Sequence, residues 1–335
     1  MVKPTGGAAE VLLIAPTDPL TDPLESKRAS KWECLIGGRN ILPKTTLTSV
    51  DGTLTGEVLK RNGSEGVIRL KWTTKETLSD VLERIAELPL PPYLNREAEA
   101  ADNERYQTVY ADRQGSAAAP TAGLHFTDAV LAKLKRKRIK RVELSLHVGL
   151  GTFKPIDVED VRDHAMHTER IVIDRRTIEE YLYHTTTDEP WVTVVGTTSL
   201  RALESVYWFG VELLEHHRTS IAPGGDDGLH IKQWAAFAPG PHVSRLYAFG
   251  AVMHWMNDMG LDVIEGTTSI LLAPGCHIAT ADALVTNFHQ PGNTLLLLVA
   301  AFLGDDWKKV YDAALAEGYR FLSYGDSSLL TRVSG

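Results

Sequence analysis

The sequence predicts an α/β protein made of a smaller all-β barrel domain and a large α/β barrel-like domain. Two observations predict this class. Strand-like segments separated by turn dipeptides fill the chain up to Trp72, whereas beyond Ala100 strand-like and helix-like segments alternate. A stiff proline-rich connector over 89–93 separates the two patterns. We therefore expect the barrel domain with a connecting helix over 1–96 and the catalytic domain over 97–335, which is ample length for both.

The first domain is built from short strands. Their alternating apolar residues predict them over 11–15, 32–36, 54–60 and 67–72. The dipeptides Asp51-Gly52 and Asn62-Gly63 are typical of tight hairpin turns, which favour a small barrel. From Thr77 to Leu88 apolar residues recur at helical spacing, and the prolines that follow end this helix.

The second part of the chain alternates between strands and helices. We expect strands over 141–147, 170–173, 191–195, 269–272 and 283–288, and helices over 177–183, 199–208, 294–302 and 307–316. Such alternation predicts a largely parallel architecture, in which ligands bind beyond the carboxyl ends of the strands. The region 206–265 fits the alternation poorly, and its pattern predicts no particular arrangement.

Composition argues against several classes of protein. The formal net charge of −8 argues against nucleic-acid binding driven by global charge. No apolar run reaches the roughly 18 residues of a membrane-spanning helix, and the first residues lack the apolar stretch of a secretion signal. Cys34 and Cys276 are too few for a disulfide framework or a cysteine-rich zinc site. We expect a cytoplasmic protein with no membrane association.

Local charge differs from the global charge in one place. The cationic segment, residues 133–141, reads Lys-Leu-Lys-Arg-Lys-Arg-Ile-Lys-Arg at the expected end of a helix. Cations there stabilise the negative end of the helix dipole, and the same cations can meet a phosphate backbone. Both interpretations predict that these side chains are exposed to solvent.

The turn Ala119–Thr127 carries Pro120, Gly123 and His125 directly before a helix-like segment. Thr127 is the expected N-cap, which would place Thr121 and His125 at the mouth of that helix. Unpaired backbone N–H groups at a helix start can bind a carboxylate, a phosphate or a nascent oxyanion. The alternative is an ordinary tight turn with a satisfied imidazole.

Three further motifs contain groups suited to ligand binding. The segments 149–152 and 196–199 follow expected strands and combine glycine with hydroxyl side chains, yet neither has the spacing of a phosphate loop or a dinucleotide fingerprint. His164, His167 and Glu169 are residue types that bind metals, but their order fits no standard metalloprotease motif. Acid–base work and surface hydrogen bonding are the alternatives for these three residues.

Taken in order, the segments resemble one family. The chain is similar to the S-adenosylmethionine:tRNA ribosyltransferase-isomerases of queuosine biosynthesis from about Gly6 to Leu330. The matching motifs are Glu87–Tyr93, Glu104–Tyr110, Ala119–Thr127, His147–Phe153, Met166–Glu169, Gly196–Ser205, Thr286–His289, Thr294–Val299 and Tyr319–Asp326. Chance could supply one of these motifs but not the ordered set.

The resemblance implies a reaction, a co-substrate and a partner. Enzymes of this family transfer the ribosyl unit of S-adenosylmethionine to 7-aminomethyl-7-deazaguanine in the tRNA anticodon arm and isomerise it, which gives epoxyqueuosine, adenine and methionine. We expect a monomer that needs no metal. Expected catalytic residues are His125, His167, Glu169, His289 and Asp326, with His125 or His289 as the proton shuttle.

The resemblance also implies two sets of binding residues. Those expected to bind the ribose, the methionine carboxylate or the tRNA base are Thr121, Gly123, His147, Gly149, Gly151, Thr152, Thr197, Thr198, Asn287, Arg320 and Tyr324. Those expected to contact the tRNA backbone are Lys133, Lys135, Arg136, Lys137 and Arg138.

The chain also departs from the family pattern. A stretch that usually precedes this start, with an Asn-Asp-Thr-Arg segment, is absent, so we expect that the usual N-terminal segment is lacking. Gln290 and Asn293 stand where the family usually has Leu and Ser, and Lys154 where it has Arg. The region 206–265 is longer than usual. Two alternatives therefore stay open: a catalytically silent tRNA-binding paralogue, and a metal-dependent hydrolase.

Overall fold

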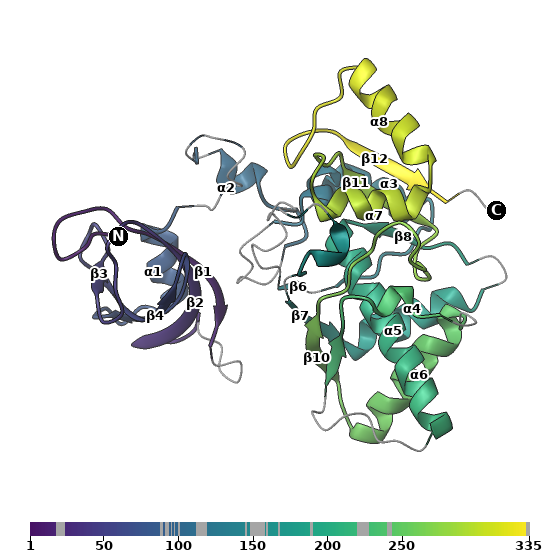
Figure 1. Cartoon of the computed structure of the whole chain (residues 1–335), viewed down its shortest axis with the longest axis horizontal. Coiled ribbons are helices and arrows are strands. Elements are labelled where there is room, and N and C mark those ends of the chain that lie inside the picture. Colours follow the sequence, from purple (N-terminus) through teal and green to yellow (C-terminus); the bar gives the residue numbers. More distant parts are fainter. Residues whose placement is uncertain are drawn as a thin grey trace. The chain divides into compact units, whose positions relative to one another are not determined.

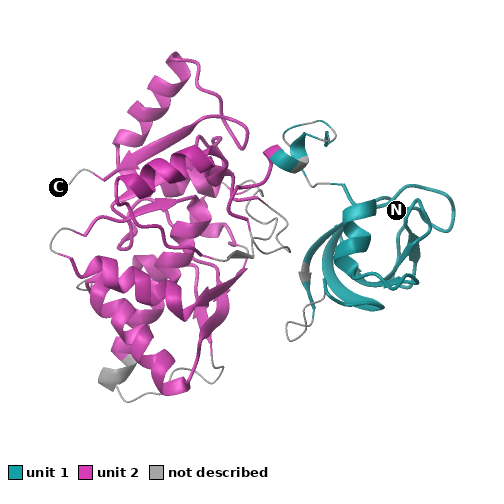
Figure 2. Cartoon of the chain, turned by 180° about the vertical axis from the view of Figure 1, so that it is seen from behind, with its two compact units in different colours: residues 1–104, 114–118 teal, residues 105–113, 119–335 magenta. Residues whose placement is uncertain are grey.

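The computed structural model divides into two compact units, residues 1–104 with 114–118 and residues 105–113 with 119–335 (Figure 2). It describes residues 1–17, 24–87, 90, 94, 96, 98–99, 101–111, 119–144, 146–147, 158, 160–166, 168–187, 190–219, 228–239 and 243–332. None of the helices within these ranges combines the length and apolar character needed to cross a bilayer.

Unit 1 is an antiparallel sheet with the order β1-β2-β5-β4-β3. Its strands are β1 (Glu10–Pro16), β2 (Ala29–Gly37), β3 (Thr46–Thr48), β4 (Leu54–Asn62) and β5 (Glu65–Trp72). Alternate residues of β2 point into the core, where Trp32, Cys34 and Ile36 are each at most 4% exposed. The four strands predicted from alternation are confirmed. β3 was missed because three residues are too short to show a period.

The sheet of unit 1 is not closed within the described ranges. Its strand order ends at β1 and β3, which do not pair with each other. Instead, Val2 makes isolated bridges to Thr48 on β3 and to Ala8, just before β1. The N-terminal residues thus lie between the two edge strands. The predicted closed β-barrel is not found.

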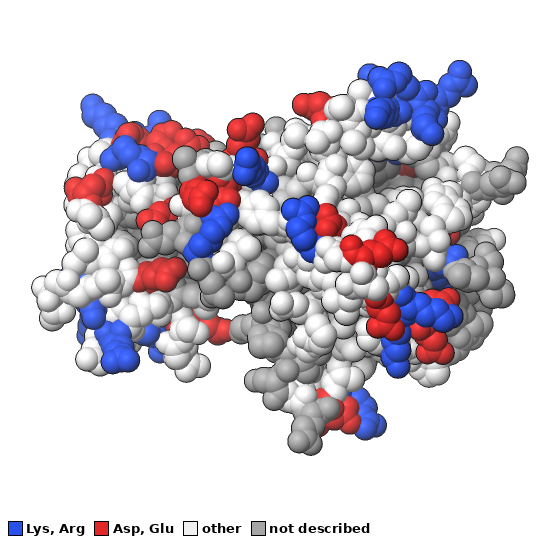
Figure 3. Space-filling view, turned by 90° about the horizontal axis from the view of Figure 1, so that it is seen from above, with Lys and Arg blue, Asp and Glu red and all other residues white. Residues whose placement is uncertain are grey.

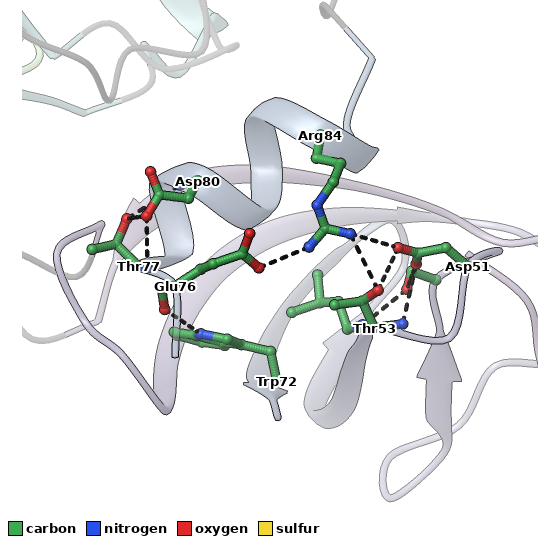
Figure 4. Close-up of polar contacts among 9 residues, drawn as sticks. Asp51, Thr53, Trp72, Glu76, Thr77, Asp80 and Arg84 are labelled. Atoms are coloured by element: carbon green, nitrogen blue, oxygen red, sulfur yellow. Dashed lines mark hydrogen bonds and ion pairs between the residues drawn. The ribbon is translucent and has the colours of Figure 1, made fainter. Parts of the chain in front are cut away.

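Helix α1 (Leu78–Ile85) packs on this sheet through Leu78 and Val81. Thr77 and Asp80 form a capping box, in which each side chain accepts a hydrogen bond from the other residue's backbone N–H. One turn later, Arg84 contacts the carboxylates of Asp51 and Glu76 (Figure 4). The predicted helix is confirmed and is shorter at its C-terminal end than expected.

Unit 2 contains two separate mixed sheets (Figure 1). The first has the order β6-β7-β10-β9, from β6 (Leu146–His147), β7 (Glu169–Asp174), β10 (Val263–Thr268) and β9 (Leu229–Ile231). The second has the order β12-β11-β8, from β12 (Ser327–Thr331), β11 (Ala283–Asn287) and β8 (Thr193–Val195). The only parallel pairs in these sheets, as far as the structure describes them, are β9 with β10 and β8 with β11.

For the described strands, the expectation of a largely parallel domain is therefore wrong, and its barrel-like form is not confirmed. Alternation along the chain specifies neither strand direction nor sheet membership. Here β7 runs antiparallel to β10, and β12 runs antiparallel to β11. The predicted strand over 269–272 is irregular, because β10 ends at Thr268, and only 146–147 of the strand expected over 141–147 is formed.

The helices of unit 2 are α3 (Asp128–Arg136), α4 (Arg175–Thr185), α5 (Thr197–Thr219), α6 (Arg245–Met259), α7 (Thr294–Leu303) and α8 (Asp306–Ala316), while α2 (Asp102–Arg105) lies at the boundary of the units. Helices α4 to α8 contribute to a large apolar core, whereas α3 has no buried residue. Helix α5 packs against strands of both sheets and along α6. The region 206–265, whose pattern predicted no particular arrangement, thus contains the rest of α5, then β9 and α6, and the beginning of β10.

Candidate active site

One edge of the three-stranded sheet collects polar residues from distant parts of the chain. Because β8 and β11 are parallel, their carboxyl ends lie at the same edge of the sheet. Gly196 directly follows β8 there, and Asn287 is the last residue of β11. Because β12 is antiparallel to β11 and Asn287 pairs with Ser327, Asp326 lies at that edge too. The short 3-10 helix η2 (Thr121–His125) contacts β11 there. The prediction that ligand-binding residue types gather beyond strand ends therefore fits this sheet.

The conformation of η2 depends on Gly123. Its N–H donates to the Pro120 carbonyl at 2.7 Å, which closes the turn. A methyl group at this position would overlap the hydroxyl of Tyr110 and press against Thr108. Directly after η2, Thr127 caps α3 by accepting a hydrogen bond from Val130 N–H, as predicted. The glycine thus allows η2 to lie against Tyr110 while the cap sets where the next helix begins.

A chain of hydrogen bonds runs from η2 to β11 and back. The Thr121 hydroxyl donates to Asn287 Oδ1 at 2.9 Å, and Asn287 Nδ2 lies 3.3 Å from His125 Nε2. The Asn287 side chain is buried, with 2% exposure of the residue, whereas His125 is exposed. Both ends of the Asn287 amide therefore face protein groups.

Arg320 and Asp326 form the charged part of the site. The guanidinium donates to Asp326 Oδ1 at 3.0 Å, and the Arg320 backbone N–H donates to Oδ2 at 2.7 Å. A side chain at Gly325 would overlap the Arg320 carbonyl, so this tight loop requires glycine. The hydrogen bonds from Arg320 lower the pKa of Asp326, and the nearby His125 lowers it further. Asp326 is thus a carboxylate near neutral pH.

The charges of this loop also act on His125. Partial burial lowers the pKa of His125, while the Asp326 carboxylate raises it and Arg320 lowers it. Tyr324, in the same loop, lies with its ring centroid 5.4 Å from that of Tyr106. His125, Asp326 and Arg320 therefore form one group, although nearly 200 residues of sequence separate the first from the others.

His289 differs from His125 in its surroundings. It is 9% exposed, its Nε2 lies 2.9 Å from the Thr286 hydroxyl, and its backbone N–H donates to the Tyr311 hydroxyl at 3.0 Å. Burial lowers the pKa of His289 to about 4. The imidazole is therefore neutral and enclosed, which suits a structural group better than one that exchanges protons with a substrate.

Glu169 belongs to a different cluster. Its carboxylate pairs with Arg201 on α5, and the Arg201 Nε donates to the Ile270 carbonyl at 3.2 Å. No contact between described residues joins this pair to His125. His167, Gly149, Gly151 and Thr152 lie outside the described residues, as does the side chain of His147, whose backbone pairs with Arg170 in the other sheet.

Thr197 and Thr198 start α5 immediately after β8, so their backbone lies at the edge that carries Asn287. Thr197 is 7% exposed and Thr198 is half-buried. Gly196 has φ +93° and lies close to Ala122 of η2. The first turn of α5 is therefore next to η2, as a shared ligand site requires.

The cationic segment is exposed, as both interpretations predicted. Lys133, Lys135, Arg136, Lys137 and Arg138 all lie on the surface at and beyond the end of α3. Figure 3 shows a dense group of Lys and Arg side chains at its upper right, in the part of unit 2 where α3 ends. Mostly uncharged surface surrounds this group.

The donor set for a metal is incomplete in the part of the chain that can be described. No three His, Cys, Asp or Glu side chains there come together as a metal site would require. Of the expected ligands, Glu169 is engaged by Arg201, and the His164 backbone carbonyl accepts from Gln233.

Comparison with known proteins identifies the family of this chain. The model of the queuosine biosynthesis protein family matches residues 1–330. The chain belongs to this family. An S-adenosylmethionine:tRNA ribosyltransferase-isomerase of Azoarcus sp. is 40% identical over 332 residues, which cover 99% of this chain and 78% of that protein. One from Nitrosospira multiformis is 38% identical over 280 residues, which cover 83% of this chain and 68% of that protein.

A solved structure is also similar. The S-adenosylmethionine tRNA ribosyltransferase of Thermotoga maritima is 23% identical, with a TM-score of 0.38 and coverage of 98% of this chain and 76% of that one. Within the queuosine biosynthesis family pattern, Asn293 replaces a usual Ser, yet its side chain caps α7 by accepting from Leu295 N–H at 2.7 Å. This departure keeps the capping function, because Asn and Ser are both good N-caps.

Sequence reasoning missed several residues that build the site. Tyr110 and Thr108 support η2, Thr286 holds His289, and Arg201 engages Glu169. All four lie inside motifs of the queuosine biosynthesis family. Their positions in those motifs were visible, but their partners were not, because a side-chain contact depends on the folded chain whether the two residues are 3 apart, as Thr286 and His289 are, or 32 apart, as Glu169 and Arg201 are.

Proposed function

We propose that this protein is an S-adenosylmethionine:tRNA ribosyltransferase-isomerase. It transfers the ribosyl unit of S-adenosylmethionine to 7-aminomethyl-7-deazaguanine in tRNA and isomerises it, which yields epoxyqueuosine-tRNA, adenine and methionine. The family match over residues 1–330 and relatives of 38–40% identity that bear this name support the proposal. The observation that carries it is structural: His125, Asn287 and Asp326, from three separate family motifs, meet at one sheet edge.

The reaction requires the kinds of group found there. The positive sulfonium of S-adenosylmethionine acidifies the adjacent C5′ hydrogens, so a positioned base can begin the sequence. Adenine needs a proton or a hydrogen-bond donor as it leaves, whereas methionine leaves as a neutral thioether. His125 is an exposed imidazole beside a carboxylate and a guanidinium, which suits the adenine step. His167 remains a candidate for the base.

Two further assignments concern binding. Arg320 and Tyr324 contact the tRNA base or the ribose, supported by the charge interaction of Arg320 with His125 and by the place of Tyr324 in the same loop. The first turn of α5, with Thr197 and Thr198, holds the ribose or the methionine carboxylate, together with Gly149, Gly151 and Thr152. Glu169 and His289, both buried, have supporting roles rather than roles in proton transfer.

The cationic segment contacts the tRNA anticodon arm. Its exposure and its density of positive charge, in a chain of net charge −8, support this assignment. The substrate also leads us to propose a cytoplasmic protein, which binds tRNA as a monomer and uses no metal.

The test is direct. Purified protein is incubated with S-adenosylmethionine and precursor tRNA, and the nucleosides are analysed by mass spectrometry. Epoxyqueuosine together with adenine is the expected product, and His125→Ala should abolish both. Binding of precursor tRNA by the wild-type protein without adenine release would identify the silent paralogue instead.

A further inference from the structure

We infer that Asn287 is a positioning residue that fixes the tautomer of His125, so that His125 presents an Nδ1–H donor to the substrate and does not remove the first proton. This inference rests on the proposed function for its chemistry. Asn287 was expected to bind substrate. The structure instead shows a buried amide whose two ends both face protein groups.

The orientation of the Asn287 amide gives the direction of the hydrogen bonds. The Thr121 hydroxyl donates to Asn287 Oδ1 at 2.9 Å, so the amide oxygen points toward η2. An amide oxygen can only accept and an amide nitrogen can only donate. The Asn287 Nδ2 group therefore points toward His125 and donates to Nε2 across 3.3 Å.

The neutral imidazole then has one possible arrangement. A neutral histidine carries one ring donor and one ring acceptor, so an accepting Nε2 places the proton on Nδ1. Since Nε2 is engaged by Asn287 and the residue is exposed, Nδ1 is the ring nitrogen left for a ligand. The lone pair that a general base would need is used by Asn287.

The network also opposes the charged form of His125. An imidazolium would set Nε2–H against the Nδ2 hydrogens of Asn287, two donors face to face. The charged groups that act on the imidazole are Asp326, which favours protonation, and Arg320, which opposes it. Partial burial is the largest influence and lowers the pKa of His125, in agreement with a neutral donor.

A neutral donor suits one part of the substrate. Adenine carries ring nitrogens with lone pairs, and charge builds up on them as the bond to ribose breaks. A fixed N–H aimed at such an acceptor stabilises the leaving group with little reorganisation. Another group must then act as the first base.

Two pairs of variants test the inference in the full-length protein. In Asn287→Asp the carboxylate accepts from Nε2–H, which reverses the tautomer and favours the imidazolium. We expect kcat for adenine release to fall on the order of 100-fold or more, as wrong tautomers do elsewhere, with KM little changed. The acidic limb of the pH profile should move to higher pH. Asn257→Asp, which changes an amide on α6 that accepts a hydrogen bond from Arg175, is the matched control and should keep the wild-type profile.

The second pair separates the two ring nitrogens. His125→Asn places an amide near Nδ1, and His125→Gln places one near Nε2, so His125→Asn should retain more kcat than His125→Gln. Equal losses in both, together with an unshifted pH profile in Asn287→Asp, would overturn the inference.

A spectroscopic measurement keeps the inference independent of turnover. The 15N chemical shifts of the His125 ring in the wild-type protein, assigned by their loss in His125→Gln, should show Nδ1 protonated and Nε2 bare. A protonated Nε2 at neutral pH would refute the inference even if epoxyqueuosine forms. If the shifts show an unprotonated Nε2 but no epoxyqueuosine is formed, the proposed function alone would be refuted.

Discussion

Glu169 on β7 and Arg201 on α5 form a buried ion pair, with 2.7 Å between Oε2 and Nη1 and 5% of each side chain exposed. β7 belongs to the four-stranded sheet, and α5 begins directly after β8 of the three-stranded sheet. The pair therefore connects the two sheets of unit 2. A buried charge that loses its partner is strongly destabilising, because its desolvation is no longer offset.

We expect Arg201→Met to lower the free energy of unfolding of unit 2 by about 3–5 kcal/mol. The double variant Glu169→Leu with Arg201→Met should be less destabilised than Arg201→Met alone, because no uncompensated charge remains. Urea unfolding measures both.

Adenine release by Glu169→Gln should fall only in proportion to the folded fraction of this variant. A larger loss of activity would restore Glu169 to a catalytic role.

Gly123 controls the position of Thr121 and His125 through η2. Gly123→Ala should lower kcat, because the added methyl overlaps the Tyr110 hydroxyl and displaces η2. Tyr110→Phe removes the overlapping oxygen, so the double variant should recover part of the lost activity. Steady-state adenine release tests this, with Tyr110→Phe alone as the control. No recovery in the double variant would show that another contact limits η2.

His289 should make unit 2 less stable at acidic pH. Its pKa is about 4 in the folded protein against 6.5 for an ordinary imidazole, so the unfolded chain binds more protons between these values. Stability is therefore lost as pH falls through this window, by about 3 kcal/mol in total. In His289→Gln this contribution disappears. Comparing unfolding of the two proteins at pH 6.5 and pH 4 should show a smaller acid loss in the variant.

Glu204 on α5 should make unit 2 less stable as the pH rises, which is the opposite of the effect of His289. Burial raises its pKa to about 7, although Thr280 and Ala279 donate hydrogen bonds to Oε1. The folded protein thus binds more protons than the unfolded chain between pH 4.5 and 7, and stability is lost as pH rises through this window. Glu204→Gln keeps the acceptor and removes the titration. Its stability should therefore decline less than that of the wild type from pH 5 to pH 8.

The cationic segment should govern the salt dependence of tRNA binding. Replacing Lys135, Lys137 and Arg138 by Glu should weaken binding and flatten the dependence of affinity on salt concentration, since each phosphate contact releases counterions. Filter binding at several salt concentrations measures this. A triple Glu variant at Lys27, Lys31 and Lys71 in unit 1 is the charge-matched control. Unchanged affinity and slope in the α3 variant would remove this segment from the interface.

Local sequence determined much of this protein. Alternation predicted four strands of unit 1, helical spacing predicted α1, α4, α7 and α8, and Thr127 was recognised as a cap because capping involves residues three apart. The family motifs identified His125, Asn287 and Asp326 before any contact between them was known. These features depend on neighbours in the chain, and a single sequence records such neighbours directly.

Tertiary structure alone decided the rest. The directions of β7 and β12, the open sheet of unit 1 and the packing of α5 against both sheets depend on which surfaces meet after the chain folds back. The same holds for the site, where His289 is buried with Thr286 while His125 is exposed and held by Asn287. Residue type determines which chemistry a side chain can perform. Its burial and its partners determine which of those possibilities are used, and for His125 the partner Asn287 lies 162 positions away.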